Sequence, residues 1–319
     1  MTTHDDEWRD DPVDDVLRRL RPVSLDALVS TADLQTRRDR KYVVPRAIVA
    51  DLVEALAAHA GVLTIDGRRS FRYESVYFDT PGLTSYLGAA RRRPDRFKVR
   101  TRTYLDAGRS MLEVKTRDRR GRTVKRRRPH APEDGTRLSP GDRRFAADAA
   151  GIGVDADRLR PTLRTRYRRT TLVVETRRPA TDTNGGYGRS DTARVTVDTD
   201  LTIEGLDGLL GGDTRSAAFS DLAIVETKSA GPATIVDRFL WGRGYRPATI
   251  SKYGTGLAYL RPRLPANKWH RVLQLRLRPR RRRPATHLRP GAPPTAARAP
   301  ETPPDTLVVG SRPRHAGAA

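Results

Sequence analysis

Hydrophobic and polar residues alternate along several short segments of the chain, as they do in half-buried β-strands. These segments are rich in Val, Thr, Tyr or Phe, and Gly-containing turns such as Asp106-Ala107-Gly108 and Arg119-Arg120-Gly121 separate some of them. Asn184-Gly185-Gly186 marks a further turn. The predicted strands are Phe71–Asp79, Phe97–Leu105, Met111–Arg117, Arg122–Arg127, Arg166–Glu175, Arg194–Ile203 and Ala223–Lys228.

Helical periodicity is confined to a few segments. Ile48, Leu52, Val53 and Leu56 recur at helical spacing after Pro45, a residue suited to the first turn of a helix. Serial strands with few helices favour an α+β fold, in which an antiparallel β-barrel or sandwich packs against helices. Further helices are predicted around Val13–Leu20 and over Leu138–Ala150, Ala233–Trp241 and Gly254–Leu260.

The net charge of +24 points to an anionic partner, and its distribution divides the chain. From Arg261 to the last residue there are 14 Lys and Arg against two acids, together with 11 of the 23 Pro residues. We therefore predict an acidic lead and short helix over 1–30, a folded domain over 31–261, and a basic Pro/Arg-rich tail over 262–319. The tail is expected to be largely disordered, because it can bury little apolar surface. Acidic lipid, a membrane protein or nucleic acid are its candidate partners.

The absence of Cys excludes a disulfide framework, a thiolate metal site and a Cys nucleophile. No apolar run approaches the ~20 residues of a transmembrane helix, and the first 15 residues lack the apolar stretch of a signal peptide. We expect a cytoplasmic protein that can dock at the inner face of the membrane.

Charged residues occupy alternate positions of the predicted strands. Lys98, Arg100 and Arg102 share one face, and Phe97 and Val99 share the other. The same alternation places Glu113 with Lys115, and Arg194 with Thr196 and Asp198, opposite apolar neighbours, and Lys125 follows across a turn.

Two interpretations of this pattern remain open. An antiparallel sheet with one solvated face would produce it. Alternatively, bases that repel one another on several strands surround a bound anion, and single acids at Glu113, Asp198 and Glu226 offer ligands to a divalent cation. A closed barrel would turn the charged face into a basic lumen.

Nine short motifs, in order along the chain, make residues 33–260 resemble the VTC domain, a polyphosphate polymerase domain of the triphosphate tunnel metalloenzyme (CYTH-like) superfamily. Each motif alone is weak, and their order carries the resemblance. They are Asp39-Arg40-Lys41-Tyr42-Val43, Ser75-Val76-Tyr77-Phe78-Asp79-Thr80, Lys98-Val99-Arg100-Thr101-Arg102-Thr103-Tyr104, Glu113-Val114-Lys115, Val124-Lys125-Arg126-Arg127, Tyr167-Arg168-Arg169-Thr170, Arg194-Val195-Thr196-Val197-Asp198-Thr199-Asp200, Glu226-Thr227-Lys228 and Ser251-Lys252-Tyr253.

The resemblance implies an antiparallel β-barrel around a basic tunnel, and transfer of the γ-phosphate of ATP to a polyphosphate chain with Mn²⁺ or Mg²⁺. It implies a metal-binding role for Glu226. The implied catalytic residues are Arg100, Arg102, Lys115 and Lys252. The implied phosphate-binding residues are Lys41, Lys125, Tyr167, Arg169, Arg194 and Ser251.

Departures from the family pattern bear on the alternatives. Asp39 stands where relatives usually carry Glu, and Arg37 where the wider superfamily often has an acid, which argues against a second hypothesis, a tunnel triphosphatase. Thr249 stands where a polymerase can have Lys. The third hypothesis is a module that binds polyphosphate without turning it over.

Overall fold

The computed structural model describes residues 12–30, 38–151, 155–176, 191–206, 215–219, 221–230, 232–273 and 278–279. The predicted acidic lead over 1–11, the turn at Asn184-Gly185-Gly186 and the part of the tail from 280 onward lie outside the described residues. None of the helices within the described ranges has the length and apolar character needed to cross a membrane.

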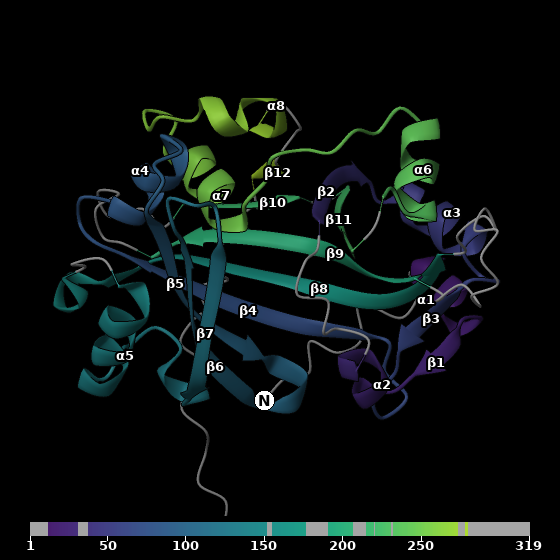
Figure 1. Cartoon of the computed structure of the whole chain (residues 1–319), viewed down its shortest axis with the longest axis horizontal. Helices are drawn as coiled ribbons and strands as arrows, with labels where there is room; N and C mark the ends of the chain where they lie inside the picture. Colours follow the sequence, from purple (N-terminus) through teal and green to yellow (C-terminus); the bar gives the residue numbers. More distant parts are fainter. Residues whose placement is uncertain are drawn as a thin grey trace, which may run out of the picture. The chain divides into compact units, whose positions relative to one another are not determined.

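One large, mostly antiparallel sheet forms the framework of the domain (Figure 1). Its main path runs β12-β10-β9-β8-β4-β5-β6-β7, β11 joins β2 to β9, and β3 joins β1 to β8. The strands are β1 (Arg21–Val23), β2 (Arg38–Pro45), β3 (Ala60–Leu63), β4 (Ser70–Asp79), β5 (Arg96–Tyr104), β6 (Arg109–Arg117), β7 (Thr123–His130), β8 (Arg160–Thr176), β9 (Asp191–Gly205), β10 (Ser216–Phe219), β11 (Leu222–Ser229) and β12 (Arg278–Pro279).

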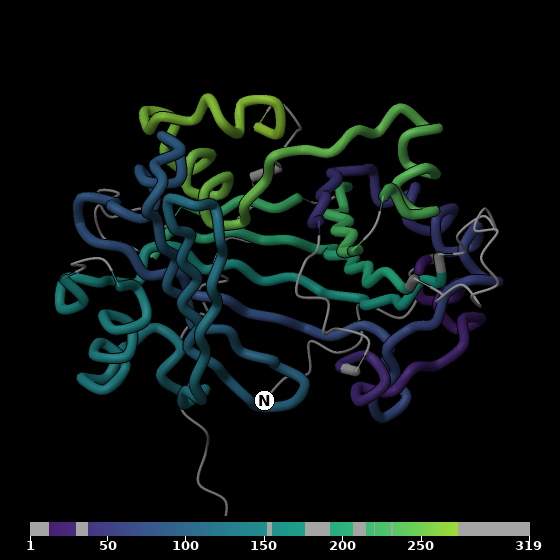
Figure 2. The backbone as a smooth tube through the Cα atoms, in the orientation of Figure 1, coloured from purple at the N-terminus to yellow at the C-terminus, as the bar shows by residue number. Residues whose placement is uncertain are grey.

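Short helices pack on both faces of this sheet, which confirms the predicted α+β class. The backbone trace shows α5 beside β6 at one end and α3 and α6 at the other (Figure 2). The helices are α1 (Pro12–Arg18), α2 (Leu25–Ser30), α3 (Ala47–Ala55), α4 (Thr84–Ala90), α5 (Pro140–Ala150), α6 (Ile235–Gly242), α7 (Lys252–Leu260) and α8 (His270–Leu273).

All seven predicted strands are present, some of them longer than expected. The helix predicted from Pro45 begins two residues later, at Ala47, because Pro45 is the last residue of β2 and pairs with Leu222 of β11. Alternation did not predict β1, β3, β10 and β12, which are too short to show a period. It also did not predict β2, for which the family motif at Asp39–Val43 was the sequence signal.

The sheet curls, but its backbone pairing does not close. Among the described strands, β2 pairs only with β11 and β7 only with β6, so both remain edges. Yet the ammonium group of Lys41 on β2 helps to lower the pKa of Lys98 on β5 and of Lys115 on β6. The Ala248 N–H donates to the Lys41 carbonyl of β2 at 2.7 Å, and three residues later Ser251 accepts from Lys98 of β5 at 2.8 Å, so β2 and β5 lie near one another. Five flat strand spacings would instead separate them by about 24 Å. The predicted closed barrel is therefore corrected to a curled, open sheet with a concave face.

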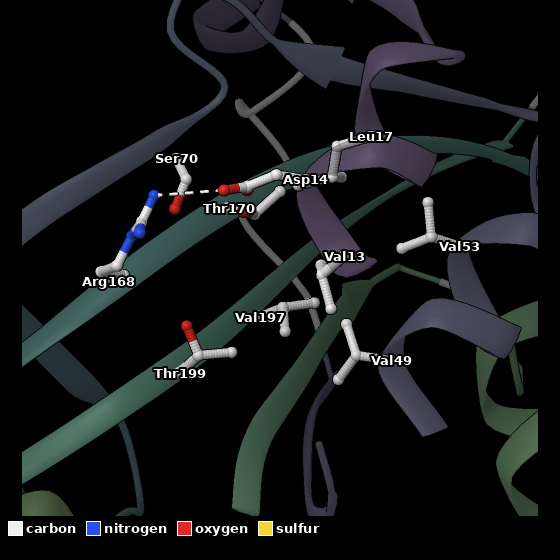
Figure 3. A pocket seen from close by; sticks show the side chains of 10 residues that line it. All are labelled: Val13, Asp14, Leu17, Val49, Val53, Ser70, Arg168, Thr170, Val197 and Thr199. Atoms are coloured by element: carbon white, nitrogen blue, oxygen red, sulfur yellow. Dashed lines mark ion pairs between the residues drawn. The ribbon is translucent and has the colours of Figure 1, made fainter. Parts of the chain in front are cut away.

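Apolar residues cover the convex face. Val195 and Val197 of β9 pack with α1, α3 and α6, and Phe97 and Val99 of β5 pack with α5. A small cavity of about 10 Å³ remains between α1, α3 and the strands, where Arg168 on β8 forms an ion pair with Asp14 at 3.6 Å (Figure 3). This cavity lies on the convex side, away from the charged face, and five of its ten lining residues are apolar.

The concave face is apolar at one end, where α7 fills it. Tyr253 of α7 stacks on Tyr77 of β4, with ring centroids 5.1 Å apart, and donates a hydrogen bond to Asp79 at 2.5 Å. The Asp79 carboxylate also accepts from the backbone N–H groups of Ser85 and Tyr86 in α4. Asp79, the last residue of β4, thus joins β4, α4 and α7.

Residues after Arg261 continue the packed core. Trp269 and Val272 are buried with α7, although they lie in the segment assigned to the tail. The ordered part of the domain therefore extends at least to residue 273.

Candidate functional site

Charged side chains line the middle of the concave face, as the alternation predicts. Lys98, Arg100 and Arg102 lie on the face of β5 opposite Phe97 and Val99, which are buried against α5. Backbone pairing aligns this row with β6 and β7, so that Arg100 lies opposite Glu113, and Lys98 lies in register with Lys115 and Lys125. The charged residues therefore gather on one face of the curled sheet, as the second interpretation requires, although Lys115 and Lys125 at its β6–β7 edge are exposed.

Glu113 is the centre of the first charge cluster. Its Oε2 atom accepts hydrogen bonds from Nε and Nη2 of Arg100, at 2.8 and 2.5 Å, and Oε1 forms an ion pair with Lys125. Arg102 approaches the same carboxylate at 4.0 Å. Burial alone would raise the pKa of Glu113, but these cations outweigh it and hold the pKa far below its ordinary value. Glu113 therefore stays ionised and fixes the Arg100 guanidinium.

Asp198 is the centre of the second cluster. It accepts two hydrogen bonds from Arg169, at 2.6 and 2.8 Å, and one from Nζ of Lys252 at the start of α7. Its side chain is 3% exposed. Burial disfavours the charge, yet Arg169 and Lys252 lower the pKa of Asp198 far below its ordinary value. The cluster ties α7 to β8 and β9.

A β-bulge in β9 determines which side chains of this strand, Asp198 among them, point to the concave face. The register between β8 and β9 shifts at Arg166–Arg168, and Asp200 in β9 has a left-handed φ of 53°. Leu201 and Ile203 pack on the concave side with α7. The extra residue at the bulge changes which positions of β9 face inward, and so Asp198 lies opposite Arg169 on the same face.

Tyrosine rings form one wall beside these clusters. Tyr73 and Tyr167 stack with centroids 5.4 Å apart, and Lys252 Nζ lies 4.2 Å from the Tyr167 centroid. The buried Tyr167 hydroxyl has no hydrogen-bond partner in the described part of the chain. Burial would raise the pKa of Tyr167, but the cations of Arg102 and Arg169 more than offset it, and the pKa is lowered. A buried hydroxyl without a partner can accept or donate to a ligand.

Lys98 belongs to the site, although the family motifs assign it no role. Its Nζ donates a hydrogen bond to Oγ of Ser251 at 2.8 Å, and Ser251 also caps α7 by accepting from the Gly254 N–H. Burial, with further repulsion from Lys41 and Lys115, lowers the pKa of Lys98 to about 7. Its place in the alternating row was the sequence signal for this residue.

Glu226 lies on β11 between two lysines. Its Oε1 is 3.7 Å from Nζ of Lys41 and of Lys228. Burial alone would raise the pKa of Glu226, but the two ammonium groups outweigh it and lower the pKa. In the described ranges no three His, Asp or Glu side chains come together as a metal site would require.

Arg194 lies apart from both acid clusters. Backbone pairing places it opposite Lys228, and its Nη2 donates to the Leu28 carbonyl of α2 at 3.3 Å. It is four residues along β9 from Asp198, which corresponds to about 13 Å. The other ten residues predicted for the site lie nearer the middle of the concave face.

A cavity of about 210 Å³ opens at the end of this face where β5 starts and β6 ends. Lys98, Lys115 and Ser251 are among the residues that line it. Three further bases, Arg96, Arg117 and Lys268, also line it. The site is thus a strip of cations that exceed the acids beside them, suited to a ligand with several negative charges.

Comparison with known proteins identifies a related domain. The family model described as the VTC domain matches residues 36–261, most of the chain. No curated protein matches the chain.

Solved structures resemble the chain distantly. A putative adenylyl cyclase from Hippeastrum, described as having a dominant triphosphatase activity, is 15% identical with a TM-score of 0.39, over 69% of this chain and 94% of that one. A conserved hypothetical protein from Pyrococcus furiosus is 11% identical with a TM-score of 0.29, over 66% and 88%. A protein from Pyrococcus horikoshii is 14% identical with a TM-score of 0.31, over 66% and 88%.

Proposed function

The chain belongs to the VTC domain family, and on that premise we propose that it is an ATP-dependent polyphosphate polymerase. It transfers the γ-phosphate of ATP to a polyphosphate chain held along the concave face. The observation that carries this proposal is the row of inward cations, in which Glu113 and Asp198 fix Arg100 and Arg169 in place.

The chemistry suits such a site. Phosphoryl transfer needs alignment of the two phosphates and stabilisation of negative charge, and little covalent help from the protein. Guanidinium groups that are already oriented lose little freedom when they bind phosphate oxygens. In this proposal Arg100, Arg102, Lys115 and Lys252 contact the transferred phosphoryl group. The residues that hold the flanking phosphates are Lys41, Lys125, Tyr167, Arg169 and Ser251.

A divalent metal fits this site only if the substrate supplies most of its ligands. Glu226 is ionised and its lysine neighbours are 3.7 Å away, so one carboxylate is available to Mn²⁺ or Mg²⁺. Such ions often bind through one or two carboxylates with substrate phosphates and water. When bound, the metal would neutralise charge on the phosphate oxygens. Lys41 and Lys228 limit how strongly Glu226 alone attracts it.

ATP turnover with Mn²⁺ tests the proposal. ADP, free phosphate and phosphate polymer are separated after incubation of the full chain, with EDTA as the control. Polymer formed together with ADP supports the polymerase. Free phosphate without polymer would instead identify a triphosphatase, and no turnover with any divalent metal would exclude both enzymes.

A second candidate is a module that binds polyphosphate without turning it over. The absence of a clustered acid site within the described residues favours it, because a catalytic metal would have only Glu226 as a dedicated ligand. Binding of tripolyphosphate with no turnover selects this candidate.

A further inference from the structure

The row of cations continues beyond the residues discussed so far. On β5, Arg96 precedes Lys98 by two positions, and on β6 Arg117 follows Lys115 by two. Arg96 and Arg117 lie directly opposite each other in the backbone register. Because alternate residues share a face, both extend the inward row toward the end of the sheet.

Four basic side chains gather at this end, and we call them the mouth cluster: Arg92, Arg96, Arg117 and Lys268. Each is close enough to influence another. Burial, followed by repulsion from Arg96, Arg92 and Arg117, lowers the pKa of Lys268, and burial with repulsion from Arg117 lowers that of Arg96. Repulsion of this kind disfavours the cluster unless an anion lies among its members.

The acids nearest in sequence are engaged elsewhere. Asp95, next to Arg96, accepts a hydrogen bond from Arg119 at 2.7 Å. Asp118, next to Arg117, accepts from Arg122 at 2.9 Å. Neither carboxylate therefore acts as the main counter-ion of the mouth cluster.

The cavity of about 210 Å³ joins this cluster to the proposed phosphate site. Arg96, Arg117 and Lys268 line it together with Lys98, Lys115 and Ser251. From Arg102 to Arg96 the row covers six residues of β5, or about 20 Å. That length exceeds the span of a triphosphate but suits a longer linear chain.

Lys268 lies outside the residues that the family model matches, which end at 261. It is nevertheless held in place. Its Nζ donates to the Ala89 carbonyl of α4 at 2.8 Å, and the adjacent Trp269 is 1% exposed. The segment after the family match thus supplies a positioned cation to the cavity.

We infer that the mouth cluster is a second binding site for phosphate chains, which holds the part of an inorganic polyphosphate that extends past the proposed transfer site. This inference rests on the proposed function of the concave face. It adds a preference for long chains over tripolyphosphate, with Lys268 and Arg117 as the residues that determine it.

The test is equilibrium binding of tripolyphosphate, a long-chain inorganic polyphosphate and a single-stranded oligodeoxynucleotide to the full chain. The variants are Lys268→Met and Arg117→Gln. Arg109→Gln is the matched control, because Arg109 is an exposed base at the opposite end of β6. Arg117 is exposed, so its substitution should leave folding intact.

Each variant should weaken binding of the long chain about fivefold, as expected for one surface cation near a polyanion, and leave tripolyphosphate binding unchanged. The salt dependence of long-chain binding should also decrease. Equal loss for both phosphate ligands, or no loss for either, would overturn the inference while the proposed function stands. Tight oligodeoxynucleotide binding with the same losses would replace it with a general polyanion site. Failure of the unaltered chain to bind tripolyphosphate would overturn the proposed function, and this inference with it.

Discussion

Arg169 and Asp198 form a two-pronged ion pair across β8 and β9, with hydrogen bonds of 2.6 and 2.8 Å, on a face that also carries Lys252. Asp198 is one of the few acids on the concave face, and it orients two cations, Arg169 and Lys252. Removing the acid should therefore affect stability and binding in opposite directions.

Asp198→Asn should lower the free energy of unfolding by about 3 kcal/mol, because it leaves two buried cations without a counter-charge. Urea unfolding measures this loss, and Asp118→Asn on the exposed hairpin is the control that should leave unfolding unchanged. Added tripolyphosphate should stabilise the variant more than the unaltered protein, since the anion replaces the missing charge. An anion that stabilised both equally would contradict the assignment of Arg169 and Lys252 to phosphate binding.

Arg100→Ala should reduce polymer formation from ATP by about a hundredfold or more, the usual loss when one fixed electrostatic contact to a reacting group is removed. The measurement is the initial rate of ADP and polymer formation with Mn²⁺. The control is Arg126→Ala on the edge strand β7, where the guanidinium of Arg126 donates to the Asp148 carbonyl of α5. This variant should leave the rate unchanged. Equal rates for Arg100→Ala and the unaltered chain would place the chemistry elsewhere.

Anion binding should depend on the charge of Lys98. Its pKa is lowered to about 7 in the folded protein, so the cationic form prevails below pH 7 and is lost as the pH rises. Tripolyphosphate affinity should therefore fall above pH 7 by more in the unaltered protein than in Lys98→Arg, which keeps its charge. Comparing the two proteins removes the ligand's own titration, and parallel pH profiles would show that Lys98 does not contact the anion.

The same pKa predicts a stability effect. An unfolded Lys has a pKa near 10.4, so between pH 7 and 10.4 the unfolded chain binds more protons at this position and stability from Lys98 rises with pH. Lys98→Met should accordingly stabilise the ligand-free protein at pH 6 and much less at pH 10. Thermal unfolding at the two pH values checks the sign, and a gain that did not shrink with pH would contradict it.

Gly254→Ala should destabilise the domain by about 1–3 kcal/mol, because a Cβ at this position would lie 2.2 Å from Cζ2 of the buried Trp269. Gly242→Ala is the control, since a Cβ there meets nothing within 4 Å. Urea unfolding, with Trp fluorescence as the probe, separates the two variants. A Gly254→Ala protein as stable as the control would mean that the Trp269 segment moves aside at little cost.

Glu226→Gln should raise the Mn²⁺ concentration needed for half-maximal activity without changing binding of tripolyphosphate in EDTA. Activity measured across a Mn²⁺ series checks this expectation. An unchanged metal requirement would remove Glu226 from the metal site.

Sequence alternation was sufficient to place Lys98, Arg100 and Arg102 on one face, because β5 is regular along its length. It could not predict the direction of Leu201 and Ile203, since the bulge at Asp200 is a single residue with a left-handed backbone and leaves no mark on hydrophobic periodicity. The ordered motifs gave eleven candidate residues. The structure brings ten of them to the middle of the concave face and leaves Arg194 near α2.

Long-range contacts account for the other differences. Helix α4 has no clear apolar period, and it is held by the Asp79 carboxylate and by α7, which comes more than 160 residues later. In the sequence, Trp269 lies in a polar, Pro-rich segment that suggests no core position. In the structure its ring packs against the backbone of Gly254. Such contacts depend on the assembled tertiary structure, which local patterns do not encode.

The open edge between β2 and the β5–β7 end of the sheet has a mechanical consequence. Across this edge the ammonium group of Lys41 helps to lower the pKa of Lys98 and of Lys115, so the like charges of β2 and of β5 and β6 repel one another. A polyanion bound between these strands would offset the repulsion and attract both sides. The ligand would then link two parts of the sheet that backbone hydrogen bonds leave unpaired. Because salt screens such repulsion, the spacing of these strands should respond to ionic strength even when no ligand is bound.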